Sequence, residues 1–173
     1  MKPLAWVPLA MCMISQASPV PDPLPVPASA DLALLPRQSV SRAVSLSSVM
    51  LIHDSETFGD DEFTRVRTLD TVNLGTSEGL IKQVRYAETA GGEICIQVDL
   101  TLTLNPADLS VNVGYFLSLY EGTSEECGGD LDGTFQSDDS VGRDTSKTIT
   151  ATVNNNDEGG DWARLTLTVL NAP

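Results

Sequence analysis

The feature that most constrains the fold of this chain is a strict two-residue alternation of apolar and polar side chains. In residues 94–104 every even position is apolar, and the odd positions hold Cys95 or a polar residue. Successive side chains of a strand point to opposite faces, so this pattern predicts a strand with one buried and one exposed face. The same alternation recurs at 111–119, 148–153 and 164–169, and more weakly at 43–52, 62–69 and 80–88.

Turn-forming residues separate these segments, and no window of helical length combines a 3.6-residue apolar period with capping residues. The turn formers are Gly91-Gly92, Asn105-Pro106, Gly128-Gly129 and Gly159-Gly160. We therefore predict an all-β domain, an antiparallel β-sandwich of seven to eight strands. A jelly roll or a small barrel is the alternative.

The N-terminal segment indicates export. Lys2 precedes an apolar run over residues 3–14, which is too short to span a bilayer as a helix and suits a signal peptide. We predict a signal peptide over 1–17, with processing after Ala30 as the alternative. Residues 18–42, rich in Pro, Ser and Ala, hold six of the ten prolines and are predicted to be a linker, which leaves 43–171 as the β-sandwich domain of a secreted, extracellular protein.

The charge of the chain restricts its partners. The formal net charge is −14, and removal of residues 1–30 takes away one base and one acid, so the remainder keeps this charge. Such a surface repels phosphate backbones and anionic lipids, which excludes nucleic acid and disfavours acidic membranes. No later apolar segment is long enough for membrane insertion. We expect the binding partner to be an extracellular protein or a cell-surface molecule.

Two cysteines remain after cleavage, Cys95 and Cys127, and in an exported chain they are predicted to form a disulfide. The chain-entropy model makes such a bridge worth roughly 3–4 kcal/mol. Cys95 occupies a polar-facing position of its predicted strand. The bridge would thus hold a long loop, residues 121–139, over the outside of the sheet, where it could serve a secreted effector, toxin or enzyme inhibitor.

Acidic residues gather in three of the predicted connections, and these are the candidate metal ligands. They are Asp54, Asp60 and Asp61 in the first connection, Asp130 and Asp132 in the second, and Asp157 and Asp161 in the third. Calcium takes six to eight oxygen ligands and tolerates flexible loops, so calcium is the predicted cofactor. The alternative is that these acids only keep the surface soluble and discourage edge pairing. The three connections meet at one end of the sandwich if residues 133–136 form a strand; otherwise 154–161 lies at the other end.

Catalytic patterns are weak in this chain. His53 is the single histidine, and no nucleophile elbow of the form G-x-S-x-G is present. Paired carboxylates at Asp60/Asp61 or Asp138/Asp139 could serve glycoside hydrolysis, but neighbours in sequence rarely face each other across a substrate. We therefore predict a non-catalytic binding module rather than an enzyme.

Two acidic segments resemble those of C2-like calcium-binding sandwiches. Residues 54–63, an acidic turn that follows an apolar strand, are similar to the opening of that family, and residues 130–133 and 137–142 resemble its later acidic loop. The chain lacks the family's proline-tyrosine pair after the first acids and its basic lipid-facing strand. The resemblance implies a secreted sandwich with calcium bound in its loops and without membrane docking.

Overall fold

The computed structural model describes residues 39–173 with the exception of 57–58, 123–126 and 158–159. The predicted signal peptide and all but the last four residues of the predicted linker lie outside this part. The first strand begins at Ser41, two residues before the predicted domain boundary. None of the described residues belongs to a helix that is long and apolar enough to cross a membrane.

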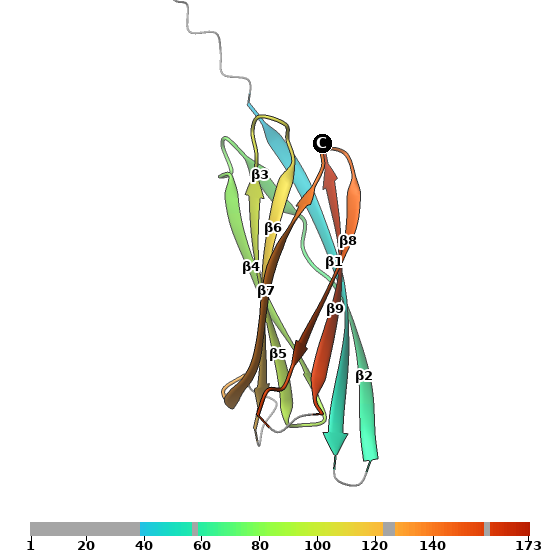
Figure 1. Cartoon of the computed structure of the whole chain (residues 1–173). Coiled ribbons are helices and arrows are strands. Elements are labelled where there is room, and N and C mark those ends of the chain that lie inside the picture. Colours follow the sequence, from blue (N-terminus) through green and yellow to red (C-terminus); the bar gives the residue numbers. More distant parts are fainter. Residues whose placement is uncertain (1–38, 57–58, 123–126, 158–159) are drawn as a thin grey trace, which may run out of the picture. The chain divides into compact units, whose positions relative to one another are not determined.

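The described residues form nine strands, which pair into two antiparallel sheets (Figure 1). The strands are β1 (Ser41–Glu56), β2 (Gly59–Thr68), β3 (Val72–Gly75), β4 (Ile81–Ala90), β5 (Ile94–Leu104), β6 (Val111–Glu121), β7 (Asp130–Val141), β8 (Ser146–Asn154) and β9 (Trp162–Ala172). Sheet A has the order β2-β1-β9-β8, with β3 also paired to β1, and sheet B has the order β4-β5-β6-β7. The predicted antiparallel β-sandwich is confirmed.

The core lies between the two sheets and follows the alternation seen in the sequence. On β5 every even-numbered side chain from Ile94 to Leu104 is buried, and on β9 every odd-numbered one from Ala163 to Asn171 is buried. Full burial of one Leu, Ile or Val side chain stabilises the fold by about 1.5–3 kcal/mol. These faces make a single apolar cluster to which both sheets contribute.

Two elements differ from the prediction. The ninth strand, β3, has four residues and only one deeply buried apolar side chain, Leu74, so it carries too few residues to show an alternation. The predicted loop 121–139 is wrong in extent, because β7 occupies Asp130–Val141 and the connection is 122–129. β7 is an edge strand with most side chains exposed, which explains why its sequence is polar.

A buried polar network closes the end of the sandwich where β1 begins. Arg42, only 3% exposed, donates from Nε to Oδ1 of Asn171 (2.9 Å) and from Nη2 to the Asn171 carbonyl (3.0 Å), and forms an ion pair with Asp144. Asn171 Nδ2 in turn donates to the carbonyls of Leu109 (2.9 Å) and Gly142 (3.1 Å). The network thus joins the first strand, the last strand and two connections.

We expect Arg42→Met to lower the free energy of unfolding by about 2–3 kcal/mol, because buried acceptors on Asn171 lose their donor. Urea unfolding near neutral pH measures this loss. Arg143→Met is the matched control, since Arg143 also contacts Asp144 (3.1 Å) but is exposed, and it should cost less than about 1 kcal/mol. Equal losses in the two variants would contradict the role given to Arg42.

The same network predicts that the stability of the fold depends on pH. The hydrogen bond from Arg42 holds the pKa of Asp144 below its ordinary value. A carboxylate with a lowered folded-state pKa stabilises the fold above its unfolded pKa, and this contribution is lost as pH falls through the folded pKa. The stability difference between wild type and Arg42→Met should therefore shrink below about pH 4, where aspartates ordinarily titrate. Urea unfolding repeated at pH 3 tests this expectation.

Candidate functional site: an acidic cleft

Strands β1, β4, β6 and β8 all end at the end of the sandwich opposite the Arg42 network (Figure 1). The connections from β4 to β5, from β6 to β7 and from β8 to β9 contribute residues to one site there. Residues 133–136 lie within β7, and this was the condition for the three acidic connections to share one end. The two sheets are tied together here, since the Asn156 amide donates to the Asp132 carbonyl (2.8 Å).

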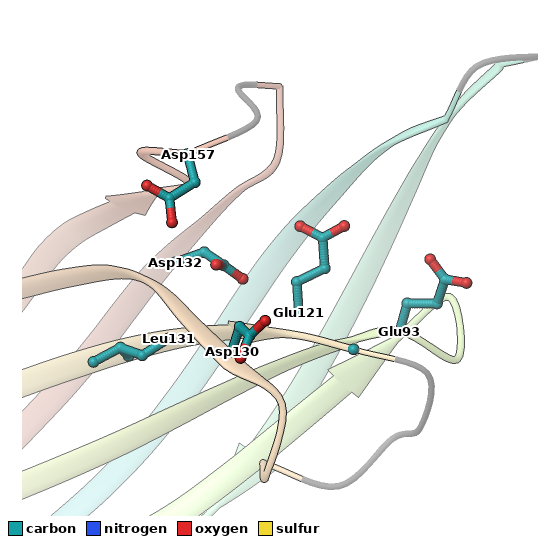
Figure 2. A pocket seen from close by; sticks show the side chains of 7 residues that line it. Glu93, Glu121, Asp130, Leu131, Asp132 and Asp157 are labelled. Atoms are coloured by element: carbon teal, nitrogen blue, oxygen red, sulfur yellow. The ribbon is translucent and has the colours of Figure 1, made fainter.

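An open cleft of about 580 Å³ lies among these connections (Figure 2). Its lining is Glu93, Glu121, Gly122, Asp130, Leu131, Asp132 and Asp157. Five of these seven residues are acids, and they come from the turn before β5, the end of β6, the start of β7 and the connection after β8. In Figure 2 the carboxylates of Asp130, Asp132, Asp157 and Glu121 surround a common space, and Glu93 lies farther along the cleft.

Asn155 and Gly133 position the carboxylates on the β7 and β8 side. Asn155 is buried, donates from Nδ2 to Oε2 of Glu121 (2.8 Å) and accepts at Oδ1 from the Asp157 amide (2.8 Å). One amide side chain therefore contacts both the Glu121 carboxylate and the main chain of Asp157. An added Cβ at Gly133 would lie 2.1 Å from the Asn154 carbonyl oxygen, so only glycine lets the start of β7 approach the end of β8 this closely.

The seven predicted metal ligands fall into separate groups. Asp130, Asp132 and Asp157 line the cleft. Asp54 and Asp161 are buried in the framework of the same end, where Asp161 Oδ1 accepts from the Ser55 amide (2.7 Å) and Asp54 packs against Gly91, whose φ is 64°. Asp61 is exposed on β2, and the side chain of Asp60 lies outside the described residues.

Sequence reasoning missed two acids of the cleft, Glu93 and Glu121. Each one stands next to a glycine of a turn that bounds a predicted strand, and this position is the signal that could have identified them. In the part of the chain that the structure describes, no group of three or more His, Cys, Asp or Glu side chains is arranged to hold a metal ion. The cleft connections also carry Glu125, Glu126 and Glu158, which lie outside that part.

His53 has a structural environment on the outer face of sheet A. Its ring stacks on Trp162, with centroids 5.3 Å apart and planes 15° from parallel, and Arg164 lies 5.1 Å from the centroid of the Trp162 ring. The pairing of β1 with β9 places His53 directly opposite Trp162. The single histidine thus packs as an aromatic neighbour, away from the acids of the cleft.

The predicted disulfide between Cys95 and Cys127 is confirmed, with their Cα atoms 5.2 Å apart. Cys95 belongs to the outer face of β5, yet it is only 1% exposed. The bridge therefore anchors the β6–β7 connection on the outside of sheet B, beside the cleft.

Loss of this bridge should lower the free energy of unfolding by about 2–5 kcal/mol, because the unfolded chain regains the freedom that the cross-link removes. Urea unfolding of the wild type with and without a thiol reductant measures the change. The Cys95→Ala/Cys127→Ala variant should be insensitive to the reductant. A wild type whose stability is unchanged by complete reduction would contradict the expectation.

Comparisons with known proteins add no relative to this picture. A scan against protein-family models finds no match, and searches of curated proteins and of solved structures find no significant match either.

Proposed function

We propose that this protein is a secreted, non-catalytic binding module whose acidic cleft binds cationic ligands, with calcium as the bound ion. The observation that carries the proposal is the gathering of five carboxylates, at three connections between strands, around one open cleft. Like charges brought together in this way raise the local negative potential and attract positive ligands. A bound cation would relieve their mutual repulsion.

The chemistry of the lining favours calcium over softer metals. The lining residues offer carboxylate and main-chain oxygens, the hard ligands that calcium prefers, and include neither His nor Cys. Calcium also accepts irregular geometry, which suits ligands from several connections. Its ligand set would be completed by water or by groups that approach on binding.

The size of the cleft supports a protein or cell-surface partner in addition to the ion. A water molecule occupies about 30 Å³ in the liquid, and the cleft has about 580 Å³, so one ion leaves most of it open. Lysine or arginine side chains of an extracellular partner fit an acidic opening of this kind. The cleft would then recognise the partner's charge, and the rigid sandwich would hold it in place.

A second candidate is an effector, toxin or enzyme inhibitor that acts through the connection 122–129. The observation in its favour is the Cys95–Cys127 bridge, which anchors this connection and lowers its freedom. Preorganisation of a binding segment reduces the entropy lost on association. Binding through this connection would be independent of calcium, which separates the two candidates.

We expect millimolar calcium to raise the melting temperature of the oxidised protein above its value in EDTA. A ligand at about 100 times its dissociation constant, bound to the native state alone, adds about 2.7 kcal/mol. For a domain of this size that free energy corresponds to a rise of several degrees. Asp130→Asn/Asp157→Asn should abolish the rise. Both residues are exposed and outside the core, so the substitutions should leave the fold intact.

The matched control is Asp70→Asn/Asp138→Asn, which removes the same charge from exposed positions outside the cleft. It should keep the full response to calcium. A wild type that melts at the same temperature in EDTA and in calcium would rule out the calcium site. Calcium stabilisation that both variants retain would place the ion elsewhere.

A further inference from the structure

β4 is an edge strand of sheet B, paired with β5 on one side only. Leu80, directly before β4, accepts a hydrogen bond from the Leu104 amide (2.8 Å), and the pairing register keeps this phase along the strand. Even-numbered residues therefore exchange hydrogen bonds with β5, and odd-numbered residues direct their N–H and C=O groups to the open side. Such an unpaired row of groups is a template for another strand.

Two arginines of β2 cover the half of this edge that lies toward the acidic cleft. Arg65 Nε donates to the Thr89 carbonyl (3.1 Å), and Arg67 Nη2 donates to the Ala87 carbonyl (3.2 Å). Both acceptors are odd-numbered, as the register requires. The two arginines are two residues apart, and so are the carbonyls they contact. The spacing of the arginine side chains on β2 therefore equals the spacing of the outward-facing carbonyls on β4.

The orientation of these arginines is fixed by further contacts. Arg67 Nε donates to Oε1 of Glu88 (2.6 Å), and its guanidinium carbon lies 5.4 Å from the ring centroid of Tyr86. The guanidinium of Arg65 lies 5.5 Å from the ring centroid of Phe63. Both arginines pair with inward-facing positions of β1, so they point toward the gap between the sheets.

The opposite side of the sandwich has a comparable arrangement. Lys147 of β8 forms an ion pair with Asp139 of β7 (2.7 Å) and donates to the Ser140 carbonyl (3.4 Å). At each side a basic residue from an edge strand of sheet A thus contacts a main-chain carbonyl on an edge strand of sheet B. This repetition indicates that the role of these contacts is to cover main-chain groups on the edge strands of sheet B.

We propose that Arg65 and Arg67, the edge arginines, keep β4 from pairing with β4 of a second copy of this chain. An antiparallel pair centred on Arg85 places Lys82 of one copy opposite Glu88 of the other, twice across the two-fold axis. Arg85 itself is already in an ion pair with Asp99 of its own chain. Such pairing needs the whole edge from 81 to 89, and the edge arginines occupy its second half.

The test is the oligomeric state of Arg65→Met/Arg67→Met, which keeps the aliphatic stems and removes the donors. We expect sedimentation equilibrium to show self-association at least tenfold tighter than in the wild type. We also expect hydrogen exchange at the outward-facing amides of residues 83, 85, 87 and 89 to slow at least tenfold when the variant associates. Far-UV circular dichroism and a cooperative urea transition establish that the variant is folded.

The control Arg143→Met/Arg164→Met makes the same changes in charge and apolar surface at exposed positions away from β4. A folded edge variant that self-associates no more tightly than the wild type would overturn the proposal. Association equal to that of the control, or association that leaves the β4 amides unprotected, would overturn it too. If the double variant fails to fold, the single variant Arg67→Met is tested in the same way. We expect the same tighter self-association, and the same results would overturn the proposal.

Discussion

The apolar layer between the two sheets is the constraint on which the rest of this structure depends. Each sheet has one apolar face, and neither face can be buried except against the other. Central strands such as β5 and β9 meet this demand through an uninterrupted alternation of buried and outward side chains. The edge strands β2 and β7 have mostly exposed side chains, because they meet fewer neighbours. The polar contacts of the molecule accordingly concentrate at its two ends and its two sides.

The two ends solve the burial of polar groups in different ways. At one end Arg42 and Asn171 satisfy each other and the carbonyls of two connections, so a charge is removed from water only where every group has a partner. At the other end the side-chain amide of Asn155 contacts the Glu121 carboxylate and the Asp157 main chain, and both acids remain beside an open cleft. The first arrangement favours stability, whereas the second gathers like charges at some cost to it. This contrast is why the acidic end, rather than the Arg42 end, is proposed to bind a ligand.

The sequence predicted the strands with two-residue alternation and the disulfide, because both rest on local pattern or on the count of cysteines. It missed what depends on neighbours distant in the chain. Arg42 lies in the predicted linker, since nothing near it in sequence indicates that Asn171, 129 residues later, accepts its hydrogen bond. The predicted loop 121–139 covers most of β7, because an edge strand needs few apolar residues. The prediction also omits the cleft acids Glu93 and Glu121, because only the folding of the sheets brings them beside Asp130 and Asp132.

The position of the disulfide bears on how the acidic end tolerates its charge. Carboxylates that share a cleft repel one another in the folded state, and this repulsion weakens the connections that carry them. A cross-link stabilises the fold mainly by restricting the unfolded chain, so its contribution does not depend on the charges of the native cleft. The Cys95–Cys127 bridge anchors the connection between Glu121 and Asp130, two acids of the cleft, to the outer face of β5. A covalent anchor at this place lets the cleft keep a charge density that packing alone would support less well, and charge density is the property that cation binding requires.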